Sequence, residues 1–198
     1  MTLPSPLELG ANAFNAGAIL FAMLNSVHTW WLSIVGCALF AVLFYDTQLY
    51  ADATLQLFFI GASIAGWFAW LRGAGGEQLP VRHVHAKSFG VMVLVALAVA
   101  GGYGWLLHRF TDAYAPFWDS IVLTFSVVAQ LLLVRRYYES WWLWLVVNTI
   151  SVPLFFSRGL DVTAVLYTAF WINAIVALVR WKKLVVARQP EALPSTSA

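Results

Sequence analysis

Two tryptophans and an asparagine share one face of an apolar segment in the last third of the chain. Trp141, Trp144 and Asn148 follow the spacing i, i+3, i+7 within residues 139–157, which places them on one side of a helix. An indole ring holds a flat ring or a delocalised cation through cation–π contact, and a carboxamide hydrogen-bonds sugar hydroxyls. This face therefore predicts a binding site for a flat, hydroxylated ligand.

A second apolar segment, residues 50–71, combines the same residue types. Gln56 and Trp67 belong to one helical face of this segment. At 1.5 Å per residue, Gln56 lies about 10 Å and Asn148 about 13 Å from the start of its segment, which is near the middle of a bilayer. We therefore expect both carboxamides to lie at membrane depth and to contact the ligand.

The same amides and tryptophans could serve helix packing or membrane anchoring instead of ligand binding, and the sequence leaves both interpretations open. Amides inside a membrane commonly hydrogen-bond a neighbouring helix, so Gln56, Asn148 and Gln130 are also candidates for packing. Tryptophan is enriched at membrane interfaces, where it anchors helix ends, and this alternative extends to Trp141 and Trp144. We expect the anchoring role for the following tryptophans: Trp30, Trp31, Trp105, Trp118, Trp142 and Trp181.

The composition excludes an ordinary soluble domain. Of the 198 residues, 62% are hydrophobic and 10% are charged, whereas soluble domains carry about 25% charged residues. A transmembrane helix needs roughly 20 apolar residues, so the length admits about six to eight spans. The net charge of +2 gives no reason to expect a nucleic-acid partner, and we expect membrane lipid around most of the chain.

Apolar runs bounded by charged residues, glycine and proline predict an all-α integral membrane protein with seven transmembrane helices. The predicted spans are residues 7–26, 29–45, 50–71, 88–108, 116–134, 139–157 and 161–182. The first contains three asparagines, so it either spans the membrane or lies in the interface.

Lysine and arginine are distributed unequally between the two sides that seven spans define. Nine of the eleven lie on one side: Arg72, Arg82, Lys87, Arg135, Arg136, Arg180, Lys182, Lys183 and Arg188. By the positive-inside rule this side is cytoplasmic. We therefore expect the C-terminus inside and the N-terminus outside.

The chain contains an internal repeat. A shift of 111 residues aligns residues 29–59 with residues 140–170 without a gap. The identical pairs include tryptophans, which chance rarely matches: Trp30 with Trp141, Trp31 with Trp142, and Trp70 with Trp181. The same shift aligns Gln56 with Tyr167, so Tyr167 is a candidate ligand contact from the second copy.

The two copies are separated by an even number of spans and so enter the membrane in the same sense, as parallel repeats. The predicted organisation is a three-helix repeat at residues 7–71, a linking helix at 88–108, a second three-helix repeat at 116–182 and a cytoplasmic tail at 183–198. Repeats of this kind place a substrate site near the bilayer midplane, between the two halves.

Three stretches of this chain resemble PnuC-type vitamin transporters: LYADATLQLFFIGASIAGWFAW (49–70), YESWWLWLVVN (138–148) and SRGLDVTAVLY (157–167). The resemblance covers residues 6–183. It implies the SWEET-like 3+1+3 fold, a homotrimer, and facilitated diffusion of nicotinamide riboside across the inner membrane of bacteria. Relatives of the same fold carry thiamine or riboflavin, so these two vitamins are the alternative substrates.

Almost no ionisable residue lies within the predicted spans. Asp52, Asp119 and Asp161 each fall within a few residues of a predicted outer helix end. Ion-coupled transporters generally bind their driving ion with buried carboxylates or unwound carbonyls, so a passive carrier is favoured. Net uptake then depends on a cytoplasmic reaction that traps the substrate, such as phosphorylation by a kinase.

An intramembrane enzyme and a non-transporting membrane protein are less favoured interpretations. Such an enzyme needs a nucleophile with a base, or metal ligands, at membrane depth, and no histidine or acid lies in the middle of a predicted span. His83 and His85 lie in a loop without further ligands, which predicts a solvated loop rather than a metal site. We expect no catalytic residue, no metal and no cofactor.

Overall fold

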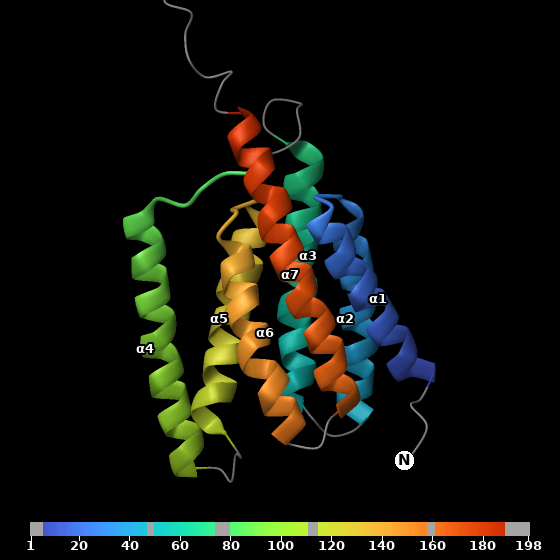
Figure 1. Ribbon diagram of the computed structural model, residues 1–198. Helices are drawn as coiled ribbons and strands as arrows, with labels where there is room; N and C mark the ends of the chain where they lie inside the picture. The colour runs from blue at the N-terminus through green and yellow to red at the C-terminus, as the bar shows by residue number, and fades with distance from the viewer. Residues whose placement is uncertain (1–5, 47–49, 74–79, 111–114, 158–160, 189–198) are drawn as a thin grey trace, which may run out of the picture. The chain divides into compact units, whose positions relative to one another are not determined.

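The computed structural model describes residues 6–46, 50–73, 80–110, 115–157 and 161–188, and these are almost entirely α-helical. Figure 1 shows the helices in chain order. Their bounds are α1 Pro6–Met23, α2 His28–Asp46, α3 Tyr50–Arg72, α4 Ala86–Phe110, α5 Pro116–Val134, α6 Ser140–Ser157 and α7 Asp161–Arg188. Each helix coincides with one predicted segment, so the all-α prediction is confirmed.

Most of these helices are apolar enough for a membrane. Within the described residues, four contain a stretch long and apolar enough to cross it: Leu55–Arg72, Ala86–Phe110, Pro116–Val134 and Ala164–Val185. Two more contain shorter apolar stretches, His28–Leu43 and Ser140–Leu154. These helices define a multi-pass membrane protein.

Helix α1 belongs to neither group, and its asparagines are satisfied within the helix. The Asn12 side chain donates to the Glu8 carbonyl and the Asn15 side chain to the Ala11 carbonyl, each at 2.9 Å. Such bonds to the preceding turn shield polar side chains from an apolar environment.

Two helix ends differ from the predicted spans by three residues or more. α1 ends at Met23 rather than residue 26, because Asn25 adopts a left-handed φ of 56° and the Ser26 N–H bonds the Phe21 carbonyl at 2.9 Å. α7 continues to Arg188, so residues 183–188 are helical rather than part of the tail. Neither glycine nor proline interrupts the chain there before Pro190.

The chain divides into two compact units, residues 1–80 and 81–198. In the first unit, α2 packs against both α1 and α3. The Thr29 hydroxyl donates to the Ala18 carbonyl at 2.8 Å and joins α2 to α1. The Ser63 hydroxyl donates to that of Ser33 at 3.0 Å and joins α3 to α2.

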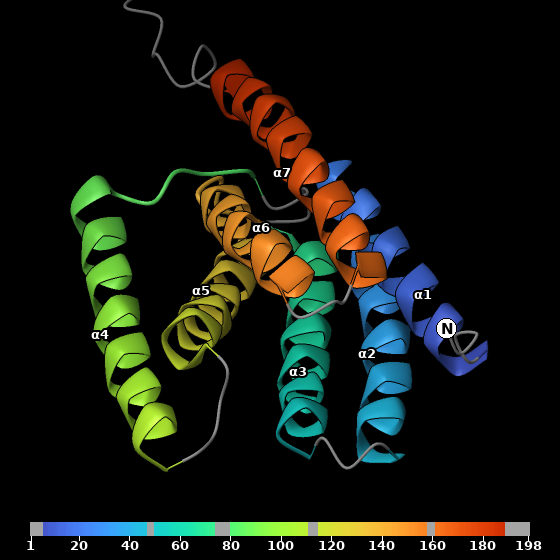
Figure 2. The same ribbon diagram turned by 60° about the horizontal axis from the view of Figure 1, so that its bottom comes forward.

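In the second unit, each helix packs against the next: α4 on α5, α5 on α6, and α6 on α7. Figure 2 shows α5 between α4 and α6. The buried cluster at the centre of these contacts comes from α4, α5 and α6: Ala96, Phe125, Ala129, Leu132, Leu143 and Val147. This cluster supports one side of α6.

The internal repeat is visible as two equivalent tryptophan pairs. Trp30 and Trp70 meet edge to face with ring centroids 5.1 Å apart, and Trp141 and Trp181 do the same at 5.5 Å. In the first pair, Gly66 provides the space, since a Cβ there would meet the Trp30 ring at 2.6 Å. The same kind of contact thus joins α2 to α3 and α6 to α7.

This pairing corrects two predicted interfacial anchors. Trp30 and Trp181 are buried, because each ring packs against a tryptophan of the neighbouring helix. The other predicted anchors are exposed on the protein surface, as an interfacial role requires: Trp31, Trp105, Trp118 and Trp142.

Candidate ligand-binding site

Helix α6 carries five polar or aromatic side chains on one side, which we call the α6 polar face: Ser140, Trp141, Trp144, Asn148 and Ser151. Successive residues of an α-helix are turned by about 100°, so these five fall within a sector of about 100°. The face extends over about 16 Å of the helix axis. It includes all three residues of this helix that the sequence predicted as ligand contacts.

Four of the five residues of the α6 polar face are buried, and within the described residues several of their polar atoms lack partners. Asn148 is 4% exposed and Ser151 is 0% exposed. Within the described residues, the Asn148 carboxamide makes no hydrogen bond, and the same holds for the hydroxyls of Ser140 and Ser151 and for Nε1 of Trp141. An unpaired buried group costs about 1–3 kcal/mol, so a ligand that bonds these atoms recovers that free energy.

The two tryptophans of the α6 polar face have different surroundings. Trp141 is buried, and its ring is covered in part by Trp181 of α7 at an interplanar angle of 77°. Trp144 is half-buried and packs on the cluster that α6 shares with α4 and α5. Trp144 therefore has more free ring surface for a ligand than Trp141.

The neighbouring helices add further polar or aromatic residues to the same unit. On α7, Tyr167 is half-buried beside Phe170, with ring centroids 5.5 Å apart. On α5, Ser126 and Gln130 are buried one turn apart, and no hydrogen bond of the Gln130 carboxamide is made within the described residues. Packing against a neighbouring helix therefore does not use the hydrogen-bonding capacity of Gln130.

The two predicted contacts on α3 lie in the first unit. Gln56 is half-buried, and its carboxamide makes no hydrogen bond within the part of the chain that the structure describes. Trp67 is exposed by about one third of its surface. Ser63, on the same helical face, is occupied by its bond to Ser33. Asp52 and Asp161, which the sequence predicts near outer helix ends, have side chains that lie outside the described residues.

Ser140 and Ser151 are the residues that sequence reasoning missed. Both lie on the predicted face, at i−1 and i+10 from Trp141, so the helical period was a sufficient signal. Serine in a membrane helix usually bonds the carbonyl of its own preceding turn, which hides this signal. Here neither hydroxyl makes such a bond.

The apolar helices define a multi-pass membrane protein, and the uncharged polar face of α6 is its candidate site for a small molecule. A family profile described as "Nicotinamide mononucleotide transporter" matches residues 5–183, and the chain belongs to this family of transporters. The predicted PnuC-type family is thereby confirmed.

Named relatives agree with this assignment. The chain is 28% identical to "Nicotinamide riboside transporter PnuC" of Escherichia coli (strain K12), over 77% of this chain and 79% of the relative. It is 27% identical to "Riboflavin/roseoflavin transporter RibM" of Streptomyces davaonensis, over 88% of this chain and 81% of the relative.

A solved structure has the same fold. The chain in "Crystal structure of the Vitamin B3 transporter PnuC" matches with a TM-score of 0.74 and 23% identity, over 92% of this chain and 83% of that chain. The helical fold of this protein is therefore that of a solved vitamin transporter.

Proposed function

We propose that this protein carries nicotinamide riboside across the bacterial inner membrane by facilitated diffusion. Relatives from Escherichia coli and Neisseria mucosa are named nicotinamide riboside transporters. The observation that carries the proposal is the α6 polar face, where Trp144 lies one turn from the buried Asn148, whose carboxamide makes no hydrogen bond within the described residues. An indole suits the cationic pyridinium ring of this ligand, and the carboxamide suits its ribose or amide group.

The residue types favour the nucleoside over its phosphate ester. The α6 polar face contains no lysine or arginine. A phosphate at membrane depth would need cationic partners, because an isolated anion there is strongly disfavoured. The family description names nicotinamide mononucleotide as the substrate. We nevertheless infer that this protein binds the mononucleotide more weakly than the riboside.

In this proposal the protein has the SWEET-like 3+1+3 arrangement, with α1–α3 and α5–α7 as parallel repeats and α4 as the linking helix. The 111-residue repeat and the equivalent tryptophan pairs support it. The proposed ligand contacts are then Gln56 and Trp67 on α3, and Trp141, Trp144, Asn148 and Tyr167 on α6 and α7. A homotrimer with an external N-terminus and a cytoplasmic C-terminus completes the proposal.

Uptake is proposed to be passive and to be made unidirectional by metabolism. The residues of the α6 polar face are neutral, so they offer no carboxylate to a driving ion. A cytoplasmic kinase that phosphorylates the riboside converts it into an anion, which this uncharged site binds poorly. Transport itself leaves the substrate chemically unchanged.

Riboflavin is the second candidate substrate. The relative RibM, named for riboflavin and roseoflavin, matches this chain at nearly the same identity and over a larger share of it. Riboflavin is also flat and hydroxylated, so tryptophans and carboxamides suit it as well. Thiamine, an aromatic cation with one hydroxyl, is the third ligand to compare.

A competitive titration tests the proposal. One purified sample is titrated by calorimetry with nicotinamide riboside, nicotinamide mononucleotide, riboflavin and thiamine. We expect the riboside to bind most tightly and to be recovered unchanged. Tightest binding of riboflavin would replace the proposed substrate by the second candidate, and tightest binding of the mononucleotide would contradict the charge argument.

A further inference from the structure

The segment that leads into α4 is held on the turn between α5 and α6. The Arg82 N–H donates to the Arg136 carbonyl at 3.0 Å, and the Tyr138 N–H donates to the Arg82 carbonyl at 2.9 Å. The two stretches thus pair as parallel strands do. The Arg82 guanidinium also lies over the Tyr137 ring, 5.1 Å from its centroid. We call residues 81–84 and 135–139 the α4–α6 junction.

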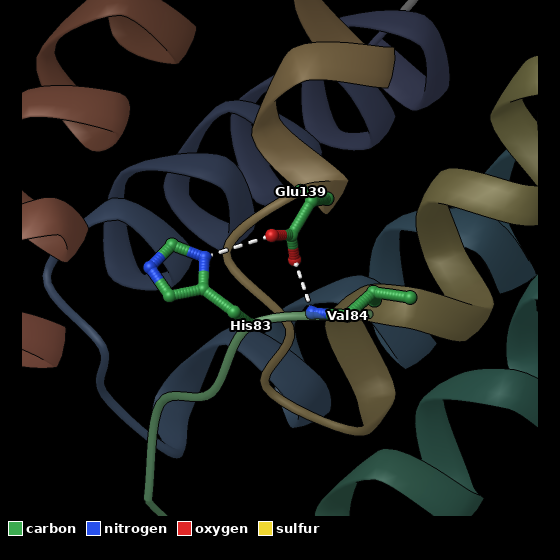
Figure 3. A network of polar contacts seen from close by, with 3 residues as sticks. All are labelled: His83, Val84 and Glu139. Carbon is green, nitrogen blue, oxygen red and sulfur yellow. Dashed lines mark hydrogen bonds and ion pairs between the residues drawn. The ribbon is translucent and has the colours of Figure 1, made fainter. Parts of the chain in front are cut away.

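Glu139 makes the side-chain contacts of the α4–α6 junction, as Figure 3 shows. One carboxylate oxygen, Oε2, accepts the Val84 N–H at 2.9 Å, and the other, Oε1, lies 2.8 Å from Nδ1 of His83. The Glu139 side chain is 12% exposed and that of His83 50% exposed. His83 and His85 are both exposed, as predicted for a solvated loop, and the His83 ring in addition pairs with a residue 56 positions away.

Glu139 also directly precedes the first residue of helix α6. Its carbonyl accepts the Trp142 N–H at 3.1 Å and the Leu143 N–H at 3.4 Å. A carboxylate beside a helix N-terminus is stabilised by the free N–H groups there. One residue thus fixes the start of α6 with its backbone and holds the segment leading into α4 with its side chain.

The turn that Glu139 ends contains a constrained residue. Arg136 is buried and has a left-handed φ of 54°, which is uncommon for a residue other than glycine. Such a conformation is strained and persists only where surrounding contacts enforce it. The pairing of Arg82 with the Arg136 carbonyl supplies a contact of this kind. If the α4–α6 junction were lost, the backbone at Arg136 could leave its left-handed conformation. The first turn of α6, which follows this turn directly, would then shift.

We propose that Glu139 is a positioning residue for the ligand site. By joining the segment that leads into α4 to the start of α6, it fixes the height and rotation of the α6 polar face, where Trp141 follows two residues later. It acts through α6 and does not touch the ligand. The choice of ligand rests on the proposed function, whereas the mechanical role of Glu139 does not.

The test compares three variants of the full-length protein with the wild type. Glu139→Ala removes both side-chain contacts. Glu139→Gln retains them, because an amide oxygen can accept the Val84 N–H and an amide N–H can donate to a neutral His83 ring. Asp46→Asn neutralises an exposed carboxylate at the end of α2 and is the matched control.

Two readouts are measured on the monodisperse fraction of each variant. Hydrogen–deuterium exchange reports the first turn of α6 and needs no ligand. Calorimetry reports the affinity for nicotinamide riboside. We expect Glu139→Ala to speed exchange in residues 140–144 and to weaken affinity by about tenfold, since a small misplacement of a site is costly. Glu139→Gln and Asp46→Asn should match the wild type within about threefold.

The outcomes separate this inference from the proposed function. Faster exchange with unchanged affinity, or a Glu139→Gln variant as impaired as Glu139→Ala, would refute the positioning role. If the wild type does not bind the riboside, the proposed substrate is refuted. The exchange measurement still tests Glu139 in that case, because unchanged exchange in Glu139→Ala would show that the α4–α6 junction does not fix the start of α6. If Glu139→Ala does not fold, His83→Ala replaces it, with the same direction of change in both readouts expected and no change refuting the proposal.

Discussion

The indole N–H of Trp171 donates to the hydroxyl of Thr149 at 2.9 Å, which joins α7 to α6 one residue after Asn148. The Thr149 hydroxyl in turn donates to the Leu145 carbonyl at 2.7 Å. Pro153 lies inside α6 and has no N–H, so the Thr149 carbonyl lacks its usual helical donor. The contact with α7 therefore braces α6 at the point where its own hydrogen bonds are interrupted.

We expect Trp171→Phe to lower thermal stability, because the substitution removes the interhelical hydrogen bond. It keeps an aromatic ring at this position, so the loss of the bond is the main change. Hydrogen bonds between membrane helices contribute about 0.6 kcal/mol on average, and up to about 1.7. Thermal unfolding of Trp171→Phe, Thr149→Val and the double variant measures the coupling. Trp142→Phe, at an exposed tryptophan of α6, is the control. Additive effects of the two substitutions would show that the bond contributes no coupling.

The helices were predictable because charge and turn residues delimit the apolar runs, and their ends were predictable only in part. The left-handed Asn25 that ends α1 depends on a local backbone conformation, and no residue type specifies it uniquely. The burial of Trp30 and Trp181 depends on which helices pack together. Apolar patterning gives the membrane segments but not their neighbours, so an anchor and a packed ring look alike in the sequence.

The candidate site was predictable where it follows a single helix. Trp141, Trp144 and Asn148 share a face because of the helical period alone. The junction between His83 and Glu139 was not predictable, because it joins residues 56 positions apart. A buried hydroxyl either bonds its own helix or, as for Ser151 within the described residues, makes no hydrogen bond. Which of the two occurs depends on rotamer and packing, which the sequence pattern does not encode.

The distribution of basic residues predicts the orientation. Nine of the eleven lysines and arginines lie on the predicted inner side, and such a bias sets topology during insertion. A C-terminal alkaline phosphatase fusion, which is active only in the periplasm, should therefore be inactive, and a C-terminal green fluorescent protein fusion should fluoresce. The reverse pair of results would show that the C-terminus lies outside.

Passive transport predicts equal final concentrations on both sides of a vesicle. In proteoliposomes loaded without substrate, uptake of radiolabelled nicotinamide riboside should stop at equilibrium whatever sodium or proton gradient is imposed, because the α6 polar face has no ionisable side chain to bind a driving ion. Empty liposomes measure the leak. Accumulation above the external concentration that collapses with an ionophore would contradict a uniport mechanism.

The ring of Trp144 and the carboxamide of Asn148 should contribute separately to affinity. A desolvated cation–π contact contributes about 2 kcal/mol, and loss of a buried polar partner costs about 1–3 kcal/mol. Trp144→Ala and Asn148→Leu should each weaken riboside binding by about one to two decades, since about 1.4 kcal/mol is tenfold. Trp144→Phe should retain most of the affinity. Calorimetry on the monodisperse fraction measures the affinity of each variant, with Trp142→Ala as control. Wild-type affinity in both Trp144→Ala and Asn148→Leu would assign the two residues to helix packing.

Ser151 should contribute to recognition of the sugar rather than of the base. Its hydroxyl is buried one helical turn from Asn148 and makes no hydrogen bond within the described chain, so a ligand hydroxyl at this position would satisfy it. Ser151→Ala should therefore weaken binding of nicotinamide riboside by about tenfold, as expected for one buried hydrogen bond of about 1–2 kcal/mol. Binding of nicotinamide, which lacks the ribose, should not change. Ser157→Ala is the matched control, because that hydroxyl is exposed and already donates to the Leu154 carbonyl at 2.8 Å. An equal loss for both ligands would indicate that Ser151 supports the helix, and no loss for either would exclude it from the site.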